Sequence, residues 1–231
     1  MQGEFELAHD IYVKINNLKK AMKCCIKMGN KDKVIEFAHM CRMPELYIMA
    51  ANFLQNLEWT KDIVKIIVSF FNRAKAYYNL ANFYEVFASI EINEKQNLTQ
   101  ACELYNEAMK TVQKVRENDE KKDNKINELK NKINFIKKYN DALNKISSAP
   151  GDALKICEEL LTVKGMENVV QEKEIYKLIF RIYYGAKDFQ SAYSCMDVCR
   201  REKKVTGLAG KDILKAVLDN VGKTDELDLY I

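Results

Sequence analysis

Proline and glycine are scarce in this sequence. The chain of 231 residues holds 2 prolines and 8 glycines, whereas ordinary usage is about 5% and 7%. No glycine occurs between Asn30 and Pro150. The chain is therefore seldom interrupted, and no segment shows the alternation of apolar and polar residues, bounded by turns, that a strand requires. The sequence excludes a fold built mainly of strands.

Charge of one sign and long apolar runs are also lacking. The 37 basic and 33 acidic residues are mixed along the chain and leave a net charge of +4. No strong single-sign field follows, so a nucleic-acid partner is not indicated. The most apolar stretch, residues 63–71, is interrupted by Lys65 and Ser69. It is too short to span a bilayer, so the sequence predicts no membrane span.

The cysteines do not form a disulfide framework. Their number, 7, is odd, Cys24 and Cys25 are adjacent, and no secretory leader precedes them. These features predict reduced thiols in a cytosolic compartment.

A metal site is not indicated either. There are 2 histidines, His9 and His39. His39 and Cys41 lie near Cys24 and Cys25 in sequence and could meet them across a helix pair. Structural zinc needs four ligands at tight spacing, and the paired Cys-x-x-Cys knuckle is absent. We interpret His9 as a polar position on the first helix.

Patterns that carry catalysis are missing too. Neither G-x-G-x-x-G nor a Walker loop occurs. Cys195 and Cys199 are four residues apart on one helix face and are expected to pack. Trp59, the only tryptophan, is interpreted as a packing anchor at a helix start, with a binding hot spot as the alternative. The sequence predicts no enzyme, no catalytic, cofactor-binding or metal-binding residue and no cofactor, and it assigns no partner-binding residue.

Helical spacing is abundant instead. Leu46, Ala50, Phe53, Leu54 and Leu57 fall at i, i+4, i+7, i+8 and i+11, which is one face of a helix. The same kind of stripe recurs along the chain, at Tyr77/Ala81/Tyr84/Ala88, Ala101/Leu104/Tyr105/Ala108/Val112/Val115, Ile175/Leu178/Ile179/Ile182, Phe189/Ala192/Tyr193/Met196 and Ile213/Leu214/Val217/Leu218/Val221.

The punctuation between stripes fits helix ends. Gly29, Gly185 and Gly222 each follow a periodic segment, as a left-handed helix cap would, and Pro44 and Pro150 suit first helical turns. In the glycine-free region, polar turns must join the helices. We predict an all-α fold of about ten helices, arranged as an α-solenoid of antiparallel, tetratricopeptide-like pairs with a period near 34 residues.

The polar segment 121–146 differs from the rest. Its apolar residues, spaced 3, 4, 3 and 7 apart, are Ile126, Leu129, Ile133, Ile136 and Leu143. This is a short heptad seam, with Asn140 at the skipped position. Two interpretations remain: a long solenoid helix with one buried stripe, or a helix that projects and pairs with a partner.

These patterns predict four parts of the chain. Residues 1–118 form tetratricopeptide-like helix pairs, and residues 119–149 form a long polar helix with the seam. Residues 150–224 continue the same solenoid as C-terminal helix pairs. Residues 225–231 form an acidic and apolar tail, which either docks back on the last helix pair or extends to a neighbour.

Residues 45–55, ELYIMAANFLQ, followed by Leu57 and Trp59, carry a family resemblance. They resemble the C-terminal helical-repeat region of the intraflagellar transport protein 140 family, a large subunit of intraflagellar transport complex A. The resemblance is specific over residues 45–108 and thin over 112–150. Other agreements occur at Phe5, Ala8, Tyr12, Ala21, Met22, Gly29, Leu80, Ala81, Phe83, Tyr84, Glu91, Ile92, Ala101, Glu107, Ala108, Cys157, Glu158, Phe189 and Tyr193.

The resemblance implies a role rather than a reaction. It implies a non-catalytic scaffold for protein–protein contacts in retrograde ciliary transport, in cargo and receptor entry, and in cilium biogenesis. The implied partners are other complex-A subunits and ciliary cargo adaptors, and the implied location is the cilium (axoneme and base) and the cytoplasm. It also implies that the chain is a fragment of a protein with N-terminal β-propellers. The alternative is a generic tetratricopeptide-like adaptor that binds short peptides in a concave groove lined by Asn and Arg.

Overall fold

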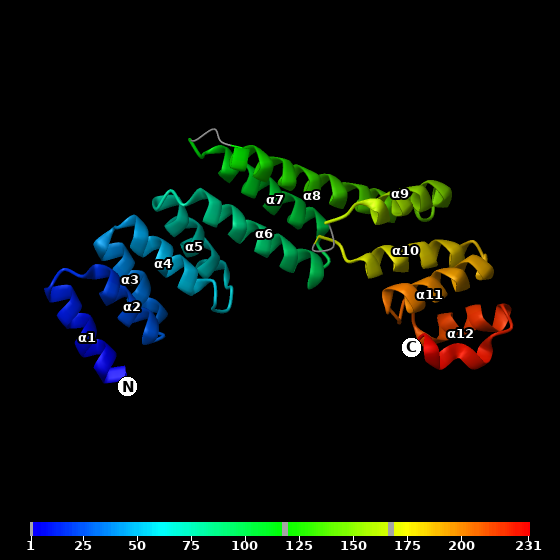
Figure 1. Cartoon of the computed structure of the whole chain (residues 1–231), viewed down its shortest axis with the longest axis horizontal. Coiled ribbons are helices and arrows are strands. Elements are labelled where there is room, and N and C mark those ends of the chain that lie inside the picture. The colour runs from blue at the N-terminus through cyan, green and yellow to red at the C-terminus, as the bar shows by residue number, and fades with distance from the viewer. Residues whose placement is uncertain (1, 117–119, 166–168) are drawn as a thin grey trace. The chain divides into compact units, whose positions relative to one another are not determined.

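The computed structural model describes residues 2–116, 120–165 and 169–231 (Figure 1). Within these ranges the chain forms twelve α-helices and one 3-10 helix, and no strand. Many helices that follow one another in the sequence pack on one another. The predicted all-α class with tetratricopeptide-like helix pairs is confirmed, with twelve α-helices where the sequence predicts about ten.

The helix bounds are as follows. The first seven are α1 (Gln2–Lys14), α2 (Leu18–Lys27), α3 (Lys31–Cys41), α4 (Pro44–Leu54), α5 (Lys61–Arg73), α6 (Tyr77–Asn93) and α7 (Leu98–Gln113). The remainder are α8 (Glu120–Lys145), α9 (Pro150–Thr162), α10 (Glu172–Gly185), α11 (Phe189–Lys203), α12 (Lys211–Asn220) and the 3-10 helix η1 (Thr224–Leu229).

The chain divides into two compact units. The N-terminal unit comprises Met1–Tyr84 and Glu107–Lys122, and the C-terminal unit comprises Glu85–Asn106 and Asp123–Ile231. The domain boundaries that we expect near residues 118, 149 and 224 stay a prediction.

The core of the N-terminal unit lies between α2, α3, α4, α5 and the start of α6. Leu46 and Leu54 of α4 are fully buried, as are Ile67, Phe70 and Phe71 of α5. The two α4 positions follow the helical stripe expected from the sequence, and both helices bury one face against their neighbours. Burial of a side chain of this size stabilises the fold by about 1.5–3 kcal/mol.

The C-terminal unit has a separate core. Its stripes come mainly from α8 to α12 and include Leu129, Ile136, Ile175, Leu178, Ile182, Ala192, Met196, Leu214, Val217 and Leu218, all buried. The sequence predicts that Ile213 is buried with this stripe, and this prediction is wrong. Ile213 is exposed, because it lies at the edge of the α12 stripe, one residue before Leu214.

At many helix ends, a residue other than glycine adopts the left-handed backbone conformation. Lys75, Gln96 and Lys187 have φ angles of 53°, 52° and 60°. After two of them, the next backbone N–H donates to the carbonyl five residues earlier, as from Ala76 to Phe71 at 3.0 Å and from Asp188 to Tyr183 at 3.0 Å. This is the Schellman arrangement usually made with glycine. It explains how chain segments without glycine can turn.

Two of the three expected glycine caps are found. Gly29 and Gly222 have φ angles of 70° and 71° and end α2 and α12 as expected. Gly185, by contrast, is the last residue of α10, and the left-handed position falls two residues later at Lys187. Pro44 and Pro150 stand in the first turns of α4 and α9, where a missing N–H costs no hydrogen bond.

Helix α8 packs along the C-terminal unit. Leu129, Ile133 and Ile136 are buried, but the buried stripe then continues through Tyr139 and Ala142. Asn140 is exposed and Leu143 is half-buried. A straight α-helix drifts by about 20° per heptad relative to a 3.5-residue repeat, so the buried face moves to the preceding residues. The stripe is therefore that of a packed helix, and Asn140 is not part of a seam.

The tail also docks. Tyr230 is 2% exposed, and its carbonyl oxygen accepts a hydrogen bond from the Gly207 N–H at 2.9 Å. The Tyr230 hydroxyl donates to Asp197 of α11 at 3.2 Å. Of the two alternatives for the tail, the docked one is found.

Candidate functional site

The histidines and cysteines do not assemble as the zinc hypothesis requires. Nδ1 of His9 lies 3.1 Å from the Ala21 carbonyl oxygen and 3.3 Å from Cys25 Sγ. His39 is exposed, and its ring packs on Phe70 with centroids 5.0 Å apart. His9, rather than His39, therefore contacts Cys25. Within the described ranges, no three His, Cys, Asp or Glu side chains gather as metal ligands.

Most of the thiols are held protonated. Burial raises the pKa of Cys25 and of Cys157 to about 11, and it raises the pKa of Cys41 and of Cys102. A nucleophilic cysteine needs the opposite shift, because the thiolate is the reactive form. The pKa of the Cys41 thiol is therefore shifted away from the reactive thiolate form.

Cys195 and Cys199 face each other on α11. A hydrogen bond between the two thiols raises the pKa of Cys195 and lowers the pKa of Cys199. Both side chains are buried. They pack in the core, as expected from their spacing.

Trp59 serves as a packing residue. Its indole N–H donates to the Gln55 carbonyl oxygen at 2.9 Å, and its ring lies 5.0 Å from that of Phe83. It immediately precedes Thr60, whose hydroxyl caps α5 by accepting from the Ile63 N–H. The packing-anchor interpretation therefore describes its contacts.

A charged cluster joins α6 and α8. Glu85 accepts from Lys125 at 2.6 Å and from Lys132 at 2.5 Å, and Glu128 pairs with both lysines. Burial would lower the pKa of Lys132, but the hydrogen bonds to Glu128 and Glu85 outweigh it and raise that pKa. The cluster is internally neutralised, so its role is to hold α8 in place.

The N-terminal unit carries a groove between α1 and α3. Its volume is about 400 Å³, and Val13, Phe37 and Met40 are among its apolar lining residues. The charged residues Glu6, Asp10, Lys33 and Glu36 also line it. Leu7 and Ile11 of α1, and Ile15 in the turn after it, are exposed apolar residues.

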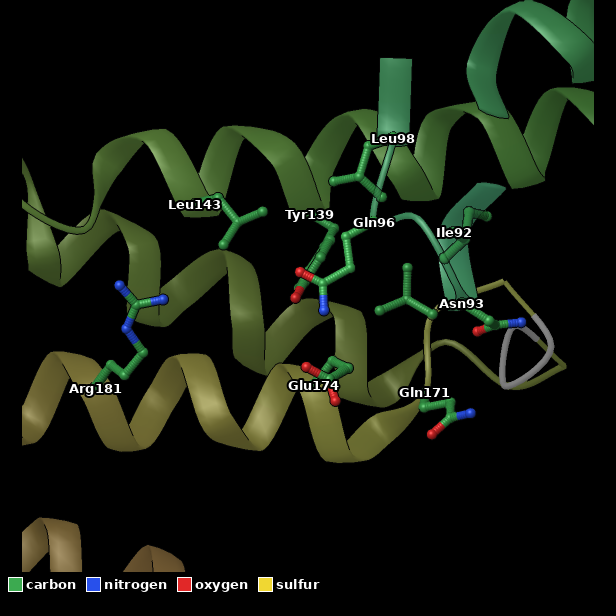
Figure 2. Close-up of a pocket in the computed structure, with 10 residues that line it drawn as sticks. Ile92, Asn93, Gln96, Leu98, Tyr139, Leu143, Gln171, Glu174 and Arg181 are labelled. Carbon is green, nitrogen blue, oxygen red and sulfur yellow. The ribbon is translucent and has the colours of Figure 1, made fainter. Parts of the chain in front are cut away.

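The C-terminal unit carries a pocket of about 260 Å³ (Figure 2). Three separate parts of the chain line it. They are the end of α6 with the turn after it and the first residue of α7, the second half of α8, and α10 with the residues just before it. Its lining residues are Ile92, Asn93, Gln96, Leu98, Tyr139, Leu143, Val170, Gln171, Glu174 and Arg181. Figure 2 shows Tyr139 in the middle of this lining, with Arg181 toward one end and Asn93 and Gln171 toward the other.

Tyr139 is the most unusual group in this pocket. Burial, together with the nearby Glu174 carboxylate, raises the pKa of Tyr139 to about 12, although Arg181 acts in the opposite direction. The phenol is therefore a neutral donor at physiological pH. Arg181 is exposed, and Glu174 pairs with Lys177 at 2.7 Å.

Comparison with known families decides where this chain belongs. Residues 79–200, more than half of the chain, match the model of the C-terminal TPR domain of intraflagellar transport protein 140. The chain belongs to this C-terminal TPR domain family. Residues 1–70 also match the model of the TPR domain shared by intraflagellar transport proteins 140 and 172.

Family membership confirms the resemblance seen at residues 45–59 and extends it. The match over 79–200 includes the region 112–150 where the resemblance is thin. The C-terminal pocket lies within this C-terminal TPR match, and the α1–α3 groove lies within the shared TPR match over residues 1–70. TPR families supply scaffolds for intraflagellar transport, and the chain is a scaffold of this kind.

Sequence reasoning missed both recessed surfaces. The pocket joins Gln96, Tyr139 and Arg181 from three parts of the chain, so no spacing in the sequence connects them. No helix in the described ranges is long and apolar enough to cross a bilayer.

Proposed function

We propose that this chain is a non-catalytic protein–protein interaction scaffold of intraflagellar transport complex A, acting in retrograde transport and in the entry of cargo and receptors into cilia. The observation that carries the proposal is the family match over residues 79–200, on a fold of packed helix pairs. Its partners are other complex-A subunits and ciliary cargo adaptors, and it acts at the axoneme, at the ciliary base and in the cytoplasm.

Two further features support a scaffold. The α1–α3 groove and the C-terminal pocket are recessed surfaces with mixed apolar and polar linings, which is the composition of transient protein interfaces. The thiols with raised pKa values and the neutralised Glu85 cluster provide no nucleophile or general base.

The test is a binding experiment in ciliated cells. The tagged 231-residue chain serves as bait, and the complex-A subunits are detected by immunoblot. A bait with Lys130→Ala, on the exposed side of α8, controls for handling. Retention of complex-A subunits is expected with both baits.

Loss of function completes the test. Removing the chain should weaken complex-A assembly and leave cargo stranded at ciliary tips. The proposal is overturned if the bait retains no complex-A subunit and its removal leaves assembly and ciliary return intact.

The second candidate is a generic adaptor that captures short peptides. The polar lining of the C-terminal pocket favours it, because Asn93, Gln96, Gln171 and Arg181 are the amide and guanidinium groups that such a groove needs. Binding of the chain to peptides, without any complex-A subunit in the pull-down, would select this candidate over the first.

A further inference from the structure

The C-terminal pocket gathers polar groups that the fold does not use. The Tyr139 side chain is 9% exposed, and its hydroxyl makes no hydrogen bond with any described residue. The hydroxyl lines the pocket, so it can donate to an acceptor that a ligand brings there.

The other polar lining residues share this property. The side chains of Asn93, Gln96 and Gln171 make no hydrogen bond with any described residue, and Arg181 forms no ion pair within the described ranges. Amide side chains both donate and accept, so they match the alternating N–H and C=O groups of an extended backbone.

Between these groups lies an apolar surface. It is formed by Ile92, Leu98, Leu143 and Val170. The pocket volume of about 260 Å³ is below the range of roughly 300–1,000 Å³ that is usual for small-molecule sites. A space of this size suits a few side chains of a longer segment, most of which stays outside.

The charges decide what kind of segment fits. Arg181 is the single cation among the lining residues and Glu174 the single anion. Glu174 is already paired with Lys177, whereas Arg181 is free to pair with an incoming carboxylate. A phosphate group fits less well, because the Glu174 carboxylate lines the same space as the Tyr139 hydroxyl.

We propose that this pocket binds an extended segment of a partner protein, in which an apolar side chain enters between Leu98 and Leu143 and a neighbouring Asp or Glu pairs with Arg181. The Tyr139 hydroxyl donates to a backbone carbonyl of the segment, and the amide side chains of Asn93 and Gln171 hold its other end. This inference rests on the proposed function, since it gives the scaffold one of its partner contacts.

The experiment begins with a library. A random heptapeptide library displayed on phage is selected on the whole 231-residue chain. The expected result is enrichment of sequences that place Asp or Glu next to Leu, Ile or Met or one position further along. Enriched peptides are then synthesised with acetylated and amidated ends, so that a terminal carboxylate cannot stand in for the side chain, and binding is measured by fluorescence anisotropy.

Charge reversal tests the role of Arg181. Arg181→Glu should weaken binding of the acidic peptides by about tenfold or more, because a charge-assisted hydrogen bond is lost and a repulsion is created. The same variant should regain affinity for peptides in which Lys replaces the acid. Lys130→Glu, an equal change of net charge on the exposed side of α8, should leave binding unchanged.

A second variant tests Tyr139 without changing the packing. Tyr139→Phe removes the hydroxyl alone, and it should weaken peptide binding several-fold. Because the hydroxyl bonds to no described residue, its removal should leave the melting temperature equal or higher. A merely structural tyrosine would show the reverse pattern, with lower stability and unchanged binding.

Two outcomes overturn the inference. The first is that the library selection yields no binding peptide, or yields peptides without a preference for Asp or Glu. The second is that Arg181→Glu leaves the affinity for the acidic peptides unchanged. Neither outcome touches the proposed function, which fails only if the wild-type bait retains no complex-A subunit and its removal leaves assembly intact. Failure of the pocket inference alone would leave the retention of complex-A subunits by the wild-type bait intact.

Discussion

Lys132 of α8 and Glu85 of α6 form an ion pair in which both side chains are largely withdrawn from water, at 16% and 12% exposure. Glu85 also pairs with Lys125, so one carboxylate contacts two ammonium groups. Removing one member of a buried pair is costly, because its partner is left charged in a poorly solvated place. Glu85 is therefore the residue of the cluster on which the placement of α8 depends most.

We expect Glu85→Gln to destabilise the protein by about 1–3 kcal/mol, since the amide keeps the shape but loses the charge-assisted hydrogen bonds. Chemical denaturation monitored by circular dichroism measures this. Glu103→Gln, on an exposed position of α7, is the matched control and should change stability by less than about 0.5 kcal/mol. Equal effects of the two variants would contradict a role for the cluster.

The same cluster predicts a pH dependence. Burial would raise the pKa of Glu128, but hydrogen bonds from Lys132 and Lys125 outweigh it and lower that pKa below its ordinary value of 4.5. A lowered folded-state pKa gives stability that is present above pH 4.5 and is lost as the pH falls through the folded-state value. The stability gap between wild type and Glu128→Gln should therefore close in acid.

Thermal unfolding from neutral pH down to about pH 3, below the ordinary carboxylate range, tests this closure. If the stability difference between wild type and Glu128→Gln stays constant over the whole range, the charge of Glu128 does not contribute to stability. At high pH the sign reverses for Lys132, whose raised pKa gives stability that is present below 10.5 and is lost as the pH rises through the folded-state value.

The docked tail should contribute measurable stability. Tyr230→Ala removes a ring that is buried against α11, where it lies 6.1 Å from the ring of Tyr193. We expect a loss of about 3 kcal/mol and a similar or larger loss on truncation after Lys223. Ile231→Ala is the control, because Ile231 is 53% exposed. An unchanged melting temperature after truncation would mean that the tail does not dock in solution.

The left-handed helix ends predict a stabilising substitution. Lys75 has a φ of 53°, a conformation that costs an L-residue roughly 1 kcal/mol and glycine nothing. Lys75→Gly should raise the unfolding free energy by about 0.5–1 kcal/mol. Lys65→Gly, inside α5, should lower it by about 1 kcal/mol. Opposite signs at these two lysines would isolate backbone conformation as the cause, and equal signs would contradict it.

The sequence predicted the helix faces better than the helix ends. Leu46 and Leu129 are buried as their spacing indicates, because helical periodicity reports which side of a helix meets the core. The cap expected at Gly185 is found at Lys187, since a left-handed residue need not be glycine when the hydrogen bonds around it are made. Asn140 was assigned to a buried seam on a 3.5-residue repeat, which a straight helix does not keep.

The candidate site could not be predicted in this way. Gln96, Tyr139 and Arg181 meet only because α6, α8 and α10 pack together, and no local pattern records that meeting. Tyr139 belongs to no sequence motif. Its place among the pocket's lining residues is a property of three dimensions, and the same is true of the contact between His9 and Cys25.

The residues at the left-handed turns have one more consequence. Arg42, Lys75, Lys187 and Lys204 are all exposed and all stand where one helix has ended. Trypsin cleaves after lysine and arginine, and it prefers backbone that can leave its helix. Brief digestion of the native protein should therefore cut first at these joints and release whole hairpins, so that a mass spectrum of the early fragments would map the repeat boundaries directly.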